Sequence, residues 1–145
     1  MPELARDGFK GELPGDYFSS RKIITHQWAV NSTFTGTGTL TLRTPTSSLR
    51  FILRAWHLVI AVKTQLAAAN GITVLFYDGT TARPGPGLAF FPAKAQAGDG
   101  RISYVDQFDG WASGAAERSL LIGASDDIST GVIRVSGVAY GSEER

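Results

Sequence analysis

Short apolar runs that recur between turn-forming residues dominate the second half of the chain. They cover residues 72–77, 88–91, 101–105, 119–122 and 130–140, and each is closed by Gly, Pro or an Asp-Gly pair. Their Val, Ile, Phe and Tyr residues fit a pleated, half-buried surface. Runs of this length at this spacing are typical of β-sandwiches and β-barrels, so the pattern predicts an all-β domain.

The first half continues this pattern from residue 22 onward. Strands are expected over residues 23–30 and within residues 33–43. Gly36 and Gly38 weaken the second of these, so firm pairing is expected only over residues 39–43. With the longer run at residues 49–62, about eight strands follow the amino-terminal segment, which is the strand count of an antiparallel jelly roll.

The run over residues 49–62 is the longest apolar stretch. Strict alternation places Phe51, Leu53 and Ala55 on one face and Trp56 on the other, together with Arg50, Ile52 and Arg54. Beyond Trp56 nearly every residue is apolar, which predicts that both faces of that half are covered.

The segment Arg83-Pro-Gly-Pro-Gly87 interrupts the β pattern. Because proline fixes φ and lacks a backbone N–H, we expect a stiff loop that excludes regular strand pairing.

Residues 1–21 differ in composition from the rest of the chain. Glycines, a proline and alternating charges separate isolated aromatic residues there, and such a segment cannot form a core of its own. Two interpretations are open: a frayed terminus, or an extended arm held on a neighbouring subunit by Phe9, Tyr17 and Phe18. The expected organisation is an amino-terminal arm over residues 1–21 and a β-sandwich domain over residues 22–145.

Composition excludes several classes of function. The chain has 145 residues, no cysteine, a net charge of +1 and a charged fraction of 19%. It therefore offers neither a disulfide framework nor a thiolate site for zinc or catalysis. Its basic residues are scattered rather than clustered, which disfavours a nucleic-acid partner. No apolar stretch approaches the ~20 residues of a membrane helix, and the amino terminus lacks the features of a signal peptide, so we expect neither a membrane partner nor Sec export.

Candidate catalytic residues are few. A hydrolytic triad would need His26 or His57 beside a serine and a carboxylate, yet the Gly-x-Ser-x-Gly pattern is absent. Because both histidines lie in expected strands beside tryptophans, packing is the favoured role, and no catalytic residue, cofactor or metal is assigned. Asp126-Asp127 is expected to form a turn, with a calcium site as the alternative, for which this loop shows too few oxygen ligands.

The aromatic residues are the remaining candidates. Trp28, Trp56 and Trp111 would suit a sugar-stacking platform, but tryptophans in a domain of this size are more often part of a core or a subunit interface. Together with three aromatic residues of the arm they form the set of candidate interface residues: Phe9, Tyr17, Phe18, Trp28, Trp56 and Trp111.

Four segments carry a resemblance to a known class of proteins. Tyr77-Asp-Gly-Thr80, Asp109-Gly-Trp111, Ser119-Leu-Leu-Ile122 and the ending Ser136-Gly-Val-Ala-Tyr-Gly-Ser-Glu-Glu144 resemble small structural proteins of tailed bacteriophages. The resemblance spans residues 22–144. It implies a jelly-roll-like β-sandwich that decorates the phage head as a cement protein, or that serves in a tail or fibre. It further implies trimers at local three-fold points of the capsid, whose arms reach neighbouring subunits or the shell.

The favoured function is therefore that of a non-enzymatic virion protein. It would be made in the host cytoplasm, form a homotrimer on the capsid surface and bridge subunits of the major capsid protein. Apolar residues on both faces of residues 55–62 and 72–77 support the homotrimer, because a sandwich strand within a monomer needs only one apolar face. A carbohydrate- or receptor-binding module of a tail fibre, with a surface glycan as partner, is the alternative. A small hydrolase or isomerase would require one of the two histidines to line a pocket.

Overall fold

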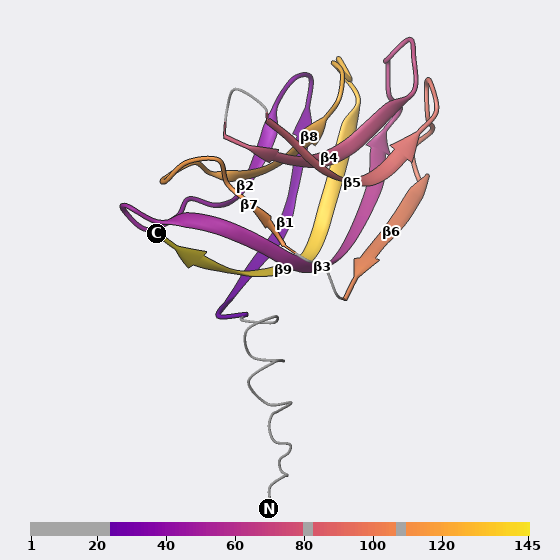
Figure 1. The fold of residues 1–145 in the computed structure, drawn as a ribbon. Helices are drawn as coiled ribbons and strands as arrows, with labels where there is room; N and C mark the ends of the chain where they lie inside the picture. The colour runs from indigo at the N-terminus through magenta and orange to yellow at the C-terminus, as the bar shows by residue number, and fades with distance from the viewer. Residues whose placement is uncertain (1–23, 80–82, 107–109) are drawn as a thin grey trace, which may run out of the picture.

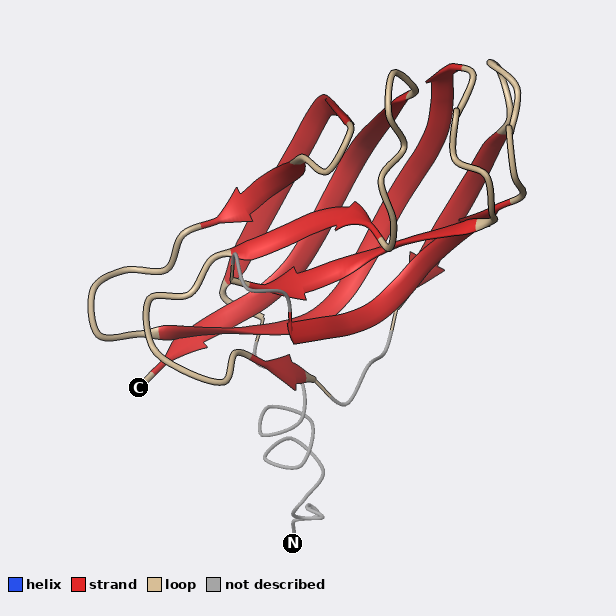
Figure 2. Ribbon diagram, turned by 90° about the horizontal axis from the view of Figure 1, so that it is seen from above, coloured by secondary structure: helices blue, strands red, loops and turns tan. Residues whose placement is uncertain are grey.

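The computed structural model describes residues 24–79, 83–106 and 110–145. All regular structure in these ranges is β-strand, which confirms the predicted all-β class (Figure 2). The strands are β1 (His26–Thr35), β2 (Thr39–Arg43), β3 (Arg50–Thr64), β4 (Ile72–Asp78), β5 (Arg83–Phe91), β6 (Gly100–Val105), β7 (Trp111–Ala112), β8 (Leu120–Ala124) and β9 (Val132–Glu144).

The strands form two antiparallel sheets that pack face to face as a β-sandwich (Figure 1). Sheet I has the order β1-β9-β3-β6, with the short β7 pairing with another part of β3. Sheet II has the order β2-β8-β4-β5. Strands β1 and β6 are the two edges of sheet I, so the carboxyl-terminal strand β9 lies inside this sheet.

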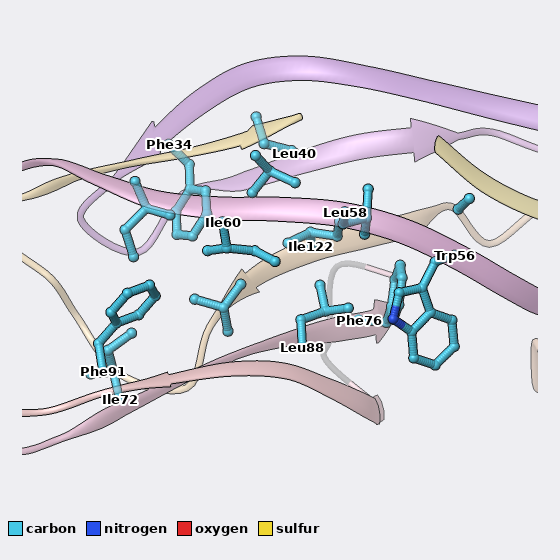
Figure 3. Packing of buried hydrophobic residues seen from close by; sticks show 14 of the residues in the cluster. Phe34, Leu40, Trp56, Leu58, Ile60, Ile72, Phe76, Leu88, Phe91 and Ile122 are labelled. Atoms are coloured by element: carbon cyan, nitrogen blue, oxygen red, sulfur yellow. The ribbon is translucent and has the colours of Figure 1, made fainter. Parts of the chain in front are cut away.

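One hydrophobic core fills the space between the sheets (Figure 3). Sheet I contributes Trp56, Leu58 and Ile60 from β3, and each has a relative exposure of 2% or less. Sheet II contributes Phe76 and Ile122, both fully buried. The rings of Trp56 and Phe76 meet edge to face with centroids 5.0 Å apart, a favourable aromatic geometry. The core therefore links the centres of the two sheets directly.

A β-bulge at Arg54 divides β3. Leu53 pairs with Gly141 and Ala55 with Tyr140, so Arg54 is one extra residue on β3. Before the bulge the inward positions are Phe51 and Leu53, whereas after it they are Trp56, Leu58, Ile60 and Val62. The predicted alternation, which placed Trp56 opposite Phe51 and Leu53, is therefore wrong, because the extra residue reverses which positions point inward.

The first strand is longer than the sequence suggests. All ten residues of β1 pair with consecutive residues of β9, so the expected break near residues 31–32 is wrong. The chain turns at Gly36 instead, which has a φ of 61°, and β2 then covers residues 39–43 as predicted. Pairing with β9 thus overrides the weak β propensity of Asn31 and Ser32.

The Pro-Gly segment is part of β5, which corrects the prediction of an unpaired loop. Pro84 lies opposite Tyr77 and Gly87 opposite Leu75, with register shifts between these pairs. Proline is tolerated because β5 is an edge strand and needs hydrogen bonds on one side only. Gly85 is required for packing, since a Cβ there would lie 2.5 Å from the ring of Trp111.

Candidate functional site

The outer face of sheet I carries an exposed apolar surface where β3 and β6 meet. Five large hydrophobic side chains are exposed in the described part of the chain, and three of them lie here. Their relative exposures are 45% for Val59, 80% for Ile102 and 60% for Tyr104. We call this surface the β3–β6 patch and include in it two aromatic neighbours, His57 and Tyr140.

Strand register brings the patch together. His57 is the cross-strand partner of Tyr104, and Val59 is the partner of Ile102. Directly opposed residues of an antiparallel pair share one face, with Cβ atoms about 5 Å apart. Since the intervening Leu58 points into the core, this face of the strand pair points away from sheet II.

Three aromatic rings form one continuous surface in the patch. The imidazole of His57 stacks on Tyr104 with a centroid distance of 4.1 Å and an interplanar angle of 21°. Tyr140 meets the same imidazole edge-on at 5.6 Å and 70°. The three rings restrict one another, so the patch is a preorganised surface rather than a set of free side chains.

The two histidines have packing contacts rather than the contacts of a catalytic base. His57 lies between two tyrosines, as above. The Nδ1 atom of His26 is 2.8 Å from the neighbouring Thr25 hydroxyl, and its ring stacks towards Trp28. Among the residues with described positions, neither imidazole is hydrogen-bonded to a serine hydroxyl or to a carboxylate. The described geometry therefore offers no nucleophile and base pair around either histidine.

The sequence did not predict the patch, because the large apolar residues of β6 face outward and its polar residues face inward. The alternation in residues 101–105 would place Ile102 and Tyr104 inward, yet these two residues face outward. The inward positions make specific contacts instead: Ser103 Oγ accepts a hydrogen bond from Trp56 Nε1 at 2.8 Å, and Arg101 lies 5.0 Å over the ring of Phe91. The sequence carries no local signal of this, because Arg101 and Ser103 alternate with Ile102 and Tyr104 as in a strand with the usual orientation.

The tryptophans do not form a shared surface. Trp28 and Trp56 have relative exposures of 4% and 2% and belong to the core. Trp111 is partly buried between Phe51, at a centroid distance of 5.6 Å, and the guanidinium of Arg83, at 4.9 Å. The alternative prediction that all three indoles form a sugar-stacking platform is therefore wrong. The other candidate residues, Phe9, Tyr17 and Phe18, lie outside the described residues.

A buried carboxylate lies at the end of β4. Asp78 has no exposed surface and accepts hydrogen bonds from the Ser113 hydroxyl at 2.6 Å, the Gly114 amide at 2.7 Å and Arg83 Nε at 3.0 Å. Burial alone would raise the pKa of Asp78, but these hydrogen bonds together outweigh it, and the pKa is lowered. The ionised carboxylate of Asp78 thus joins β4 to Arg83 of β5 and to the loop before β8. Because its oxygens are already hydrogen-bonded, it is suited to a structural role rather than to proton transfer.

A second ionic contact joins the ends of β2 and β9. Arg43 forms a salt bridge with Glu143, whose other oxygen accepts the Thr46 amide hydrogen bond at 3.1 Å. Burial raises the pKa of Glu143, yet the bonds from Arg43 and Thr46 lower it more strongly, so the net shift is downward. Both buried acids thus stabilise the same end of the sandwich in their charged forms.

The acidic pair Asp126-Asp127 forms the predicted turn, in which Asp127 Oδ1 accepts the Ser129 amide hydrogen bond at 2.7 Å. Within the described ranges there is no group of three or more His, Cys, Asp or Glu side chains placed to hold a metal ion. The same ranges contain no helix long and apolar enough to cross a membrane.

Comparison with known proteins adds no relative to this description. A scan against protein-family models and a search of curated proteins both find no match. The geometry of the β3–β6 patch is therefore the basis on which a function is argued.

Proposed function

We propose that the protein is a non-enzymatic structural protein that assembles with copies of itself, as a trimeric decoration or cement protein on a tailed-phage head. The observation that carries the proposal is the β3–β6 patch. Ile102, Tyr104 and Val59 are held in register on a rigid sheet and are left in water by the single chain. Contiguous exposed apolar surface with fixed geometry is a mark of protein contact sites.

Burial of this patch is a sufficient source of association energy. A large apolar side chain contributes roughly 1.5 to 3 kcal/mol when it is fully buried. Val59, Ile102 and Tyr104 together thus offer several kcal/mol per subunit contact, before the cost of association. In a closed trimer three such contacts form at once, and the linked contacts reinforce one another.

The strand order supports the finer assignment to a jelly roll. Sheet I has the order β1-β9-β3-β6 and sheet II the order β2-β8-β4-β5. Leaving out the two-residue β7, each strand of one sheet thereby faces its neighbour along the chain in the other sheet, as in a sandwich wound from two Greek keys. Jelly rolls are frequent in viral capsid and lectin domains, so this order fits both the cement protein and a carbohydrate-binding module.

Sedimentation or light scattering tests the assembly. The full chain should give three times its mass of 15.5 kDa at micromolar concentration. The double substitution Ile102→Ser and Tyr104→Ser should shift the mass towards the monomer. The matched control is Phe90→Ser, since Phe90 is 58% exposed but lies on β5 of sheet II. A full chain that is monomeric, or a mass lowered equally by the control, contradicts the proposal.

The virion role needs a separate experiment. The protein would be made in the host cytoplasm and would bind assembled shells of the major capsid protein. Shells of the major capsid protein from the same genome should retain the purified protein during sedimentation through a density gradient. Free capsid subunits should retain it less, because a bridging protein gains avidity only from an assembled lattice. Absence of binding to shells would remove the cement role while leaving self-assembly intact.

A carbohydrate- or receptor-binding module is the second candidate. It is favoured by one observation, the broadly exposed ring of Tyr104 held flat against His57. Aromatic faces of this kind can stack on the apolar face of a sugar. A glycan array probed with the full chain tests it: binding that disappears in Tyr104→Ser and persists in Phe90→Ser would favour the glycan partner.

A further inference from the structure

Symmetry limits which surface of a neighbouring copy can meet the β3–β6 patch. A patch that meets its own copy about a two-fold axis closes a dimer. A closed trimer is built from head-to-tail contacts, in which two different surfaces of each chain meet. The trimer proposed above therefore requires a second apolar surface that differs from the patch.

The sequence offers such a surface before β1. In residues 9–17 the odd positions are Phe9, Gly11, Leu13, Gly15 and Tyr17, whereas the even positions are Lys10, Glu12, Pro14 and Asp16. Alternate side chains of an extended chain point to opposite sides. In an extended conformation this segment thus has one side of large apolar and glycine residues and one side of charged residues and proline.

We infer that the β3–β6 patch is the docking site for residues 9–17 of a neighbouring copy of the chain. This inference rests on the proposed trimer and names the contact that would hold it together. The apolar side of the segment, with Phe9, Leu13 and Tyr17, would lie on Ile102, Tyr104 and Val59. Its charged side would remain in water.

The dimensions of the two surfaces agree. Successive anchors in the segment are four residues apart, which is about 13 Å in an extended chain. The patch reaches across three strands, from β6 to Tyr140 on β9, or about 10 Å across the sheet. Along the strands it extends from Ile102, opposite Val59, to Tyr140, opposite Ala55, which is again about 13 Å. Two neighbouring anchors therefore fit on one patch.

The place where the chain enters sheet I favours a contact between copies. Thr25 donates its amide hydrogen bond to Gly141 just before β1, so the preceding segment starts at the β1 edge. The patch lies at the β6 edge, on the opposite side of the same sheet. A head-to-tail ring in which the β1 edge of one copy lies beside the β6 edge of the next would bring segment and patch together without a reversal of the chain.

Disulfide trapping tests this contact directly, because the full chain contains no cysteine. Two single-cysteine chains, Tyr17→Cys and Ile102→Cys, are refolded together and oxidised. We expect a cross-linked product that contains one chain of each kind. The matched control pair, Asp16→Cys with Phe90→Cys, changes the charged side of the segment and an exposed residue of sheet II, and should give little product.

Two trapping results would overturn the inference. The first is a dominant product made of two Ile102→Cys chains, because it would mean that patches meet each other. The second is an internal cross-link in the chain carrying both Tyr17→Cys and Ile102→Cys, without a mixed product on refolding the single-cysteine chains together. In that case the segment would cover its own patch.

A second measurement separates this inference from the trimer itself. The full chain with Phe9→Ser and Tyr17→Ser should require at least about tenfold more protein to reach half-association than the natural sequence, since two anchors no longer bury apolar area. The control with Glu12→Ser and Asp16→Ser should associate normally. A trimer unaffected by the anchor substitutions overturns the docking segment alone, whereas a natural chain that is monomeric overturns the proposed assembly.

Discussion

The inner and outer faces of β3 have similar side chains but different surroundings. Trp56, Leu58 and Ile60 point inward, where sheet II covers them and leaves at most 2% of each exposed. His57 and Val59 point outward, where their cross-strand and stacking partners are residues of the same sheet within the described ranges, and Val59 remains 45% exposed. An apolar run on both faces of a strand therefore does not mean that its own chain covers both faces. The two faces should contribute to different equilibria, folding for the inner one and association for the outer one.

The largest expected effect is on the inner face. Trp56→Ala should lower the free energy of unfolding by about 3 to 5 kcal/mol, because it opens a large cavity and removes the hydrogen bond to Ser103. Urea denaturation followed by far-UV circular dichroism measures this. Val59→Ala on the outer face is the control and should cost less than about 1 kcal/mol. Similar losses for both variants would erase the distinction between the faces.

A smaller effect is expected at the buried acid Asp78, which extends the comparison to polar groups. Asp78→Asn should cost about 1 to 3 kcal/mol, since it weakens hydrogen bonds to a charged acceptor while keeping the size of the side chain. The matched control is Asp126→Asn, because Asp126 is an exposed acid in the β8–β9 turn. A loss as large in the control would assign the effect to net charge rather than to the buried network.

The lowered pKa of Asp78 also predicts how the free energy of unfolding depends on pH. The pKa of Asp78 is lowered in the folded protein, and that of Glu143 is lowered as well. Their contribution is therefore complete above the unfolded-state values of about 4 and is lost as the pH falls through the lower folded values. Urea midpoints measured from pH 7 downward should be flat at first and then fall below about pH 4. The fall should be shallower in Asp78→Asn, and an identical profile would contradict this role of Asp78.

Substitutions on the outer face should have little effect on the free energy of unfolding of the unassociated chain. Ile102→Ser with Tyr104→Ser should change the unfolding free energy by no more than about 0.5 kcal/mol at protein concentrations too low for association, because both side chains are exposed in the single chain. At higher concentration the same variant should lose the extra stability that assembly gives to the natural chain. A large loss at every concentration would place these residues in the folding core.

The smallest effect is expected from removing the amino-terminal segment. A chain that starts at Arg21 should keep its far-UV spectrum and its low-concentration stability within about 0.5 kcal/mol, since the described core begins at Trp28. Its self-association should fall, as expected for the loss of the docking segment. If the shortened chain aggregates or unfolds, residues 1–20 are part of the core.

The sequence was sufficient for the class of fold and most of the strands, because period-two patterns and Gly turns are local signals. It was insufficient where tertiary contacts decide. Pro84 is paired because β5 lies at a sheet edge, and Ile102 faces outward because Ser103 and Arg101 have partners inside. Neither fact is encoded within a few neighbouring residues. For the same reason the sequence could not separate core from interface among the tryptophans, of which Trp28 and Trp56 lie in the core.

The bulge at Arg54 bears on how this chain tolerates insertions and deletions. In a regular strand the loss of one residue turns every later side chain to the other side of the sheet. Deleting Arg54 is different, because Ala55 would then follow Leu53 directly, the existing pairs with Tyr140 and Gly141 would form a regular ladder, and Trp56 would still point inward. The backbone can therefore lose the bulged residue without reversing the two faces of β3, whereas a deletion later in the strand reverses them. A chain that lacks Arg54 should therefore keep Leu58 and Ile60 in the core, whereas a chain that lacks Val59 should turn Ile60 towards solvent.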